Sequence, residues 1–97
     1  MRYPILENDE VKIWRTVISP NEPLSLHRHD KHRVVIPLKD VTLKKIVEGS
    51  GRTEDIKFAF RQAYWVEADP PEELHELHAE VNESNEEMEV IVMEFKS

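Results

Sequence analysis

Short segments rich in β-branched and aromatic residues recur along almost the whole chain, and their close spacing restricts the fold more than any other feature. The segments are VKIWRTVIS (11–19), LSLHRH (24–29), RVVIPL (33–38), VTLKKIV (41–47), IKFAF (56–60), AYWV (63–66) and MEVIVMEF (88–95). Turn-forming residues separate them, as in PNEP (20–23) and in EGSGRTED (48–55), which holds both glycines. Many short strands at this spacing predict an all-β sandwich or barrel.

The length allows one domain. A chain of 97 residues builds a single hydrophobic core, so we expect one domain over residues 1–97. A composition that is 39% hydrophobic and 34% charged is typical of a soluble globular protein. No apolar run approaches the length of about 18 residues that a membrane helix needs, and the N-terminal stretch is no signal peptide. Because the chain also lacks cysteine, we expect a cytoplasmic location.

The charge balance excludes two classes of partner. The net charge is −7, and the few basic residues are interrupted by acidic ones. General binding to nucleic acid depends on clustered lysines and arginines that neutralise phosphates, and binding to an anionic membrane surface depends on the same clusters. We therefore expect neither nucleic acid nor membrane as a partner.

One segment allows two interpretations. In DPPEELHELHAEV (69–81), Asp69 suits a helix N-cap, Pro70 the first helical position and Glu72 the capping box, so propensity favours a helix. The alternative is a single turn near the prolines, followed by a strand from about Leu77. The choice matters because the two structures direct His75 and His78 differently.

Histidines concentrate in LSLHRHDKHR (24–33), which holds His27, His29 and His32. Alternate residues of a strand share a face, so His27 and His29 lie about 6.6 Å apart on one side and can hold one cation together. A third ligand must come from His32, His75 or His78. The alternative is a solvated face, because charged residues flank the pair.

Three stretches resemble the conserved motifs of the cupin family. PNEPLSLHRHDKHRVVIPL resembles the first motif, RQAYWVEADPPEELHELHAEVNES the second, and EEMEVIVMEFK the last strand. The resemblance covers about residues 11–96. It implies a double-sheet jelly-roll barrel, the double-stranded β-helix of the cupins, and it favours a strand from His78 onward.

The resemblance also implies a metal site inside the barrel. His27 and His29 match the family's His-x-His pair, and His78 matches the second-motif histidine because Asn82 follows at the expected offset. His75 is the alternative third ligand. Three imidazoles suit a divalent metal such as Zn, Fe, Ni, Cu or Mn and leave open coordination positions.

Some positions depart from the family pattern. Arg33 stands where the family has a glutamate ligand, and a guanidinium cannot ligate a metal. Glu22, Arg61 and Asp69 stand near positions where glycine is common. The chain is therefore either a cupin with a three-histidine site or one that has lost its metal. In the metal-free case, the histidines would line a polar pocket and bond to one another or to Asn82.

Several other side chains have expected roles. Arg33 either binds the carboxylate or phosphate of a small ligand or, as we favour, pairs with an acid, for which Asp30 is within reach. Tyr64 and Trp65 should face opposite sides of a short strand. We expect one to join the core and the other to lie at the pocket mouth or in a subunit contact, with the core as the default place for each. We also expect core positions for the aromatic residues Trp14, Phe58 and Phe60.

The predicted function is a small cupin of undefined activity that binds a divalent metal through His27, His29 and His78. The alternatives are a metal-dependent dioxygenase or isomerase and a metal-free module for ligand or protein contacts. An enzyme would need a general acid or base, for which the candidates are Tyr64, His75 and Glu80. We also expect a homodimer, because open edge strands must be covered, and a small-molecule ligand.

Overall fold

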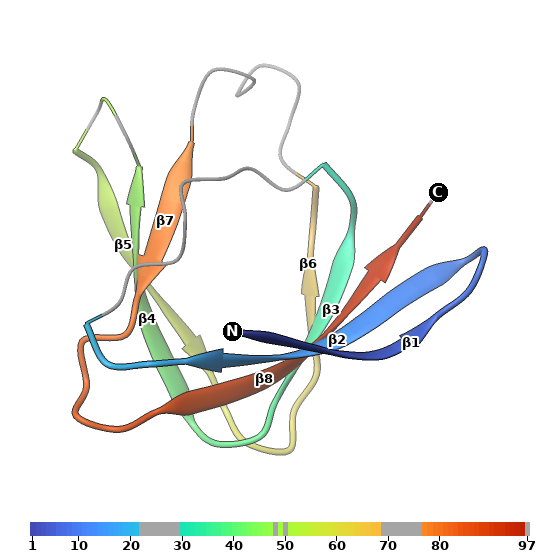
Figure 1. Cartoon of the computed structure of the whole chain (residues 1–97). Coiled ribbons are helices and arrows are strands. Elements are labelled where there is room, and N and C mark those ends of the chain that lie inside the picture. The colour runs from blue at the N-terminus through green and yellow to red at the C-terminus, as the bar shows by residue number, and fades with distance from the viewer. Residues whose placement is uncertain (22–29, 48, 50, 69–76, 97) are drawn as a thin grey trace.

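The computed structural model contains two antiparallel sheets, and it describes residues 1–21, 30–47, 49, 51–68 and 77–96. Its strands are β1 (Arg2–Glu7), β2 (Val11–Ile18), β3 (Arg33–Pro37), β4 (Val41–Val47), β5 (Thr53–Phe58), β6 (Tyr64–Val66), β7 (His78–Val81) and β8 (Met88–Phe95). One sheet has the order β1-β2-β8-β3-β6 and the other the order β5-β4-β7. Figure 1 shows the sheets facing each other.

Most predicted strands are confirmed. VTLKKIV and MEVIVMEF coincide with β4 and β8, and the β-branched segments 11–19 and 33–38 contain β2 and β3. The segment 48–55 was expected to be a loop, but its last residues belong to β5, which begins at Thr53. Strand β1 was not expected. Its side chains are exposed throughout and it contains Pro4, which is typical of edge strands, so its formation depends on pairing with β2 at the edge of the sheet.

The ambiguous segment 69–81 ends in a strand. Residues 78–81 form β7, which pairs with β4 from Val47↔His78 to Lys44↔Val81. The helix favoured by propensity is therefore wrong for these residues, because pairing with a neighbouring strand outweighs a weak local preference. Residues 69–76 and the predicted strand 24–29 lie outside the described residues.

The core lies between the two sheets. It contains Trp14, Ile18, Val35, Val41, Leu43, Met88, Val90 and Val92, with Ile56, Phe58 and Val66 partly buried against it. We call the face of each sheet that carries these residues its inner face and the opposite one its outer face. The alternating burial of β2 and β8 matches the strand period, so inner residues are every second one.

Three aromatic residues were predicted to lie in the core. One of them does, the second is partly buried and the third is exposed. Trp14 is only 3% exposed and belongs to the core, whereas Phe58 is half-buried. Phe60 is 46% exposed, and its predicted core position is wrong. Strand β5 ends at Phe58, and the chain then turns, with the Phe60 amide donating to Asp40 Oδ1 over 2.9 Å. The alternation of apolar and polar residues in IKFAF therefore extends past Phe58, where the strand itself ends.

Candidate functional site

Most of the predicted metal ligands lie outside the residues that the structure describes. His27, His29 and His75 lie outside the described residues, and His78 begins β7 opposite Val47. Among the described residues, no group of three or more His, Asp or Glu side chains gathers in a way that could hold a metal ion. The three-histidine site therefore stays a prediction.

The described chain nevertheless brings together the two sequence regions that carry these histidines. Pro20 forms a parallel bridge with Asn82, and the Asn21 amide donates to the Asn82 carbonyl over 2.7 Å. Asn21 leads into the segment with His27 and His29, and Asn82 directly follows the strand that begins at His78. One end of the first-motif segment is thus fixed beside the strand of the second motif.

Asn82 is the anchor of this junction. Its side chain is fully buried, and its Nδ2 donates to the carbonyls of Ile18 and Glu86 at 3.0 and 2.7 Å. Its Oδ1 accepts from the amide and the hydroxyl of Ser84 at 2.9 and 2.7 Å. All its hydrogen-bonding positions are therefore used within the chain, and its evident role is to join β2, β7 and the turn before β8.

Glu80 introduces a carboxyl group into the interior. It lies in β7 opposite Lys45 of β4, its side chain is among the buried polar ones, and the residue is only 8% exposed. Burying a carboxylate is unfavourable unless cations, hydrogen bonds or protonation compensate for the loss of water. The strand that begins with His78 thus contains a buried acid two residues further on.

Arg33, at the position where the resemblance implies a metal-binding glutamate, forms an ion pair. Its Nη2 lies 2.8 Å from Glu94 Oε2, and its Nε donates to the same oxygen over 3.0 Å. The pairing that we favoured from the sequence is therefore present, and the structure identifies Glu94 as a partner. In register, Arg33, Glu94 and Lys12 lie side by side on neighbouring strands and share the inner face.

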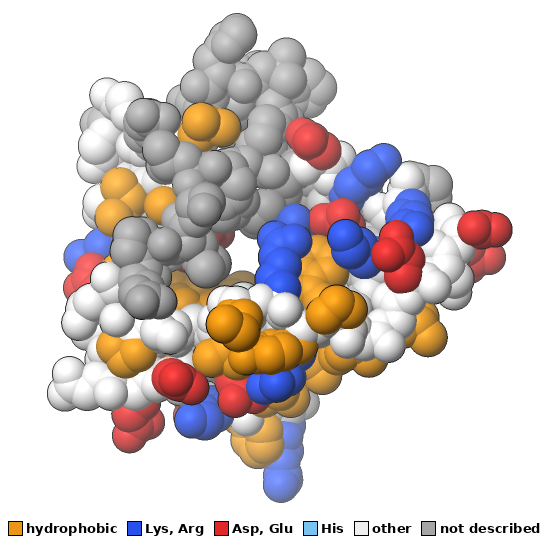
Figure 2. Space-filling model, in the orientation of Figure 1, with side chains coloured by type: hydrophobic (Ala, Val, Ile, Leu, Met, Phe, Trp, Pro, Cys, Tyr) orange, Lys and Arg blue, Asp and Glu red, His pale blue; other side chains and the backbone are white. Residues whose placement is uncertain are grey.

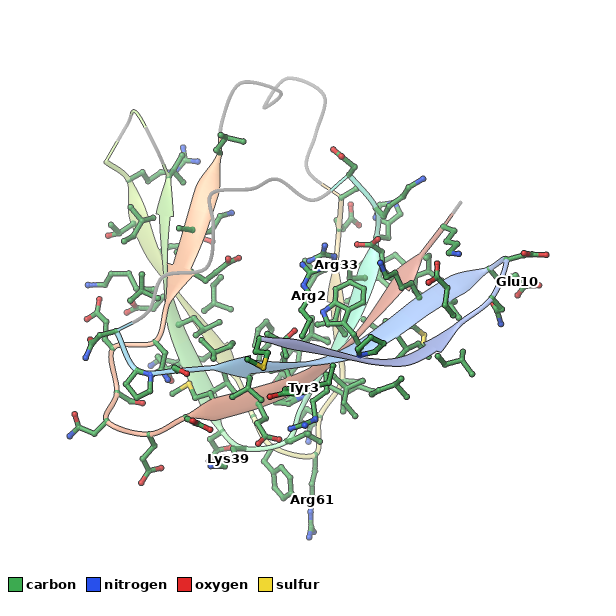
Figure 3. All side chains as sticks on the ribbon, viewed as in Figure 1. Arg2, Tyr3, Glu10, Arg33, Lys39 and Arg61 are labelled. Atoms are coloured by element: carbon green, nitrogen blue, oxygen red, sulfur yellow. The ribbon has the colours of Figure 1, made fainter. Side chains whose placement is uncertain are left out.

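Three cations surround the ring of Trp14, a feature that the sequence did not reveal. Arg2, Arg33 and Lys12 place their charged groups 4.5, 5.5 and 5.9 Å from its centroid. Figure 3 shows Arg2 and Arg33 projecting towards the space between the sheets. Arg2 could not be assigned to this cluster from the sequence, because β1 itself was not predicted.

A cavity of about 280 Å³ adjoins this cluster. It is lined by Arg2, Pro4, Ile5, Leu6, Glu7, Lys12, Ile13 and Trp14, all from β1 and β2. A bulge between Pro4 and Leu6 interrupts the pairing of these strands. Bulges often redirect side chains next to binding sites, and this one lies within the lining of the cavity.

Tyr64 and Trp65 face opposite sides of β6, as predicted. The Tyr64 ring lies 4.8 Å from that of Phe58, and its hydroxyl accepts a hydrogen bond of 2.7 Å from the Ala59 amide. Trp65 is 56% exposed on the outer face, so its default core position is wrong. The ring of His32 stacks on Trp65 at 5.3 Å, and its Nδ1 accepts from the Ala68 amide, which places His32 away from the inner face.

Comparisons with known proteins identify the fold. No family model matches the chain, and no curated protein is similar to it in sequence. A cupin domain from Bordetella pertussis superposes with a TM-score of 0.81 and 20% identity, over 100% of this chain and 93% of the other. An RmlC-like cupin family protein from Methanocaldococcus jannaschii gives a TM-score of 0.70 and 14% identity, over 98% and 78%.

A third structure, an uncharacterized conserved protein from Klebsiella pneumoniae with a double-stranded β-helix domain, gives a TM-score of 0.68 and 12% identity over 98% and 75% of the two chains. The chain therefore has the cupin fold, an all-β double-stranded β-helix. Identities this low establish the fold and leave the function to be argued from residues. In the part of the chain that the structure describes, no helix is long and apolar enough to cross a membrane.

Proposed function

We propose that this cupin-fold protein binds a divalent metal through His27, His29 and His78 and acts as a small metal-binding module of the cytoplasm. The observation that supports the proposal is the junction at Asn82, which fixes the start of the segment with His27 and His29 beside the strand that begins at His78. Two segments that are far apart in the sequence rarely converge on one cation unless the topology holds them together.

The donor chemistry fits such a metal. Neutral imidazoles bind Zn, Fe, Ni, Cu and Mn, and a three-histidine site leaves positions for water or a small molecule. Glu80 adds support, because a buried carboxyl in the same strand as His78 favours a nearby cation. When bound, the metal would supply Lewis-acid or redox chemistry.

Elemental analysis of untagged protein tests the proposal. We expect a stoichiometric metal in the wild type and its loss in His27→Ala and in His78→Ala. His32→Ala is the matched control, because His32 packs against Trp65 on the outer face and should leave the metal in place. Occupancy should also fall as the pH drops below about 6.5, where imidazoles protonate. A wild type that stays metal-free after reconstitution at neutral pH contradicts the proposal.

Turnover separates a binding module from an enzyme. Loaded protein that converts a small thiol, keto acid or sugar would favour a metal-dependent dioxygenase or isomerase, with Glu80 or His75 as the acid or base. Tyr64 is the third catalytic candidate; its hydroxyl accepts a hydrogen bond from the Ala59 amide and keeps its own proton to donate. Substrate assays of the loaded wild type and of Glu80→Gln distinguish these cases.

A specific observation also favours a protein-contact role, as a homodimer. One row of side chains across the outer face of the five-stranded sheet is apolar from edge to edge, and the large side chains at both ends of the row are exposed, Leu6 at 50% and Trp65 at 56%. Between them, Ile13, Met93 and Val34 are paired across the sheet and stay only half-buried, whereas Arg15 and Glu89 form an ion pair elsewhere on this face. A continuous apolar row with charged residues beside it is typical of an interface, and a two-fold axis would bury the same row of both copies.

Light scattering at micromolar concentration tests the dimer. We expect the mass of two chains for the wild type and of one chain for Leu6→Glu combined with Trp65→Glu. Phe60→Glu changes an equally exposed aromatic residue in the turn after β5, at 46% exposure, and should leave the mass unchanged. A wild type that scatters as a single chain excludes the dimer.

A further inference from the structure

The cavity between β1 and β2 combines two cations with an apolar lining. Glu7, which also lines it, pairs with Lys96 at 2.8 Å, and Glu94, opposite Lys12 on β8, pairs with Arg33 at 2.8 Å. Within the described residues, neither Arg2 nor Lys12 forms an ion pair. The cavity therefore carries two cations and one carboxylate that is paired with a lysine outside the lining, in a chain whose net charge is −7.

The cations are held in place by the packing of the hairpin. The guanidinium of Arg2 lies 4.5 Å from the centroid of Trp14, whose ring is almost fully buried, and the amine of Lys12 lies 5.9 Å from it. The backbone beside Arg2 is fixed, because the Val17 amide donates to the Met1 carbonyl over 2.9 Å. Side chains that are ordered before binding lose less conformational entropy when a ligand arrives.

The remaining lining sets the kind of ligand. Pro4, which lies opposite Trp14 on the same face as the two cations, and the neighbouring Ile5 present apolar surface to the cavity. On the face of the molecule drawn in Figure 2, hydrophobic side chains and side chains of Lys and Arg lie side by side. A volume of about 280 Å³ lies at the lower limit of ligand pockets, which suits a molecule with one ring or a short aliphatic body.

We propose that this cavity binds a small organic anion, with its carboxylate or phosphate between Arg2 and Lys12 and its apolar body against Pro4 and Ile5. Arginine binds either acid with two parallel hydrogen bonds, and lysine adds a point charge. The residues of the cavity are distinct from the predicted metal ligands. The proposal is therefore independent of metal binding.

Fluorescence of Trp14 provides the test, in chelator-treated protein that carries Trp65→Phe so that one tryptophan remains. Benzoate and phenyl phosphate are the probes, and benzyl alcohol and inorganic phosphate are the controls, at constant ionic strength. We expect a saturable change with at least one aromatic anion and none with benzyl alcohol. The tighter of the two anions identifies the preferred acid group.

Charge variants locate the site. Arg2→Gln and Lys12→Gln should each weaken binding of the aromatic anion by about tenfold, and Arg2→Lys by less. Arg61→Gln is the matched control, because Arg61 also lies over an aromatic ring, 5.2 Å from the centroid of Phe60, in the turn between β5 and β6. Near-ultraviolet circular dichroism verifies that each variant is folded.

Three results would overturn the proposal. One is the absence of a saturable change with either aromatic anion up to about 10 mM. Another is unchanged affinity in both Arg2→Gln and Lys12→Gln. The third is binding of benzyl alcohol or inorganic phosphate as tight as that of the aromatic anions, because the cavity would then recognise only one half of the proposed ligand.

Discussion

Arg33 of β3 and Glu94 of β8 face each other across neighbouring strands, and their side chains form an ion pair of 2.8 Å on the inner face of the larger sheet. The two side chains are 16% and 24% exposed, so the pair is mostly shielded from water. At the position where the resemblance to cupins implies a carboxylate, this chain thus has a cation with its own acid.

The first prediction concerns the strength of this pair. Glu94→Gln should lower the free energy of unfolding by about 1–3 kcal/mol, because a partly buried guanidinium loses its charged partner. Glu83→Gln, which breaks the more exposed pair between Lys44 and Glu83, should cost about 0–1 kcal/mol. Urea unfolding measures both values. Equal costs for the two variants would show that shielding adds nothing to the Arg33 pair.

The second prediction concerns the junction at Asn82. Asn82→Ala should destabilise the protein by about 2–4 kcal/mol, because it leaves the buried carbonyl of Ile18 and the polar groups of Ser84 and Glu86 without their partner. Asn85→Ala changes an exposed residue of the same turn and should cost less than about 0.5 kcal/mol. Thermal unfolding compares them, and a mild effect of Asn82→Ala would mean that water replaces the amide.

The sequence predicts the positions of the strands better than it predicts which strands pair with each other. Val41–Val47 and Met88–Phe95 were predicted to the residue, because β-branched residues and alternating burial are local properties. Strand β1 was missed, since its side chains stay exposed and only its backbone pairing with β2 makes it a strand. Propensity alone favoured a helix over the residues that form β7, because pairing with β4 is not visible locally, whereas the strand from His78 that the resemblance favoured is confirmed.

For the candidate site too, single residues could be predicted from the sequence, whereas their partners on other strands could not. The ion pair of Arg33 was expected, but Glu94 is 61 positions away and only the sheet register joins them. Phe60 was assigned to the core because the alternation of IKFAF continues past the end of β5. The cluster of Arg2 and Lys12 around Trp14 requires the β1–β2 pairing, which no local pattern announces.

A turn position gives the third prediction. Arg61, which stands near a position where cupins often have glycine, adopts a φ of 70°, in the left-handed region. Glu22 and Asp69, the other two such positions, lie outside the described residues. Arg61→Gly should be more stable than Arg61→Ala by about 1 kcal/mol, because both remove the guanidinium and only glycine relieves the backbone strain.

Lys57 provides the control for this comparison. It lies inside β5 and is not among the described residues with a positive φ. Glycine there should be less stable than alanine by about 0.5–1 kcal/mol, since glycine loses more backbone entropy on folding. The opposite order at positions 61 and 57, measured by urea unfolding, supports the interpretation. The same order at both positions would contradict it.

The fourth prediction concerns Glu7, at the end of β1, whose carboxylate accepts a hydrogen bond of 2.8 Å from Lys96 Nζ. This bond and the charge of Lys96, with a smaller effect of Lys12, hold the pKa of Glu7 below its ordinary value of 4.5. Because the pKa is lower in the folded protein, Glu7 stabilises the fold above pH 4.5, and this contribution disappears as the pH falls through the lowered pKa.

Lys96→Met should therefore raise the pKa of Glu7 towards 4.5, and Lys12→Gln should raise it less. A carbon-detected NMR titration of the side-chain carboxyl measures the shift, with Lys39→Met as a control, since Lys39 binds the Glu87 carbonyl instead. If Lys12→Gln shifts the pKa more than Lys96→Met, the cavity cation and not the C-terminal lysine controls this carboxylate.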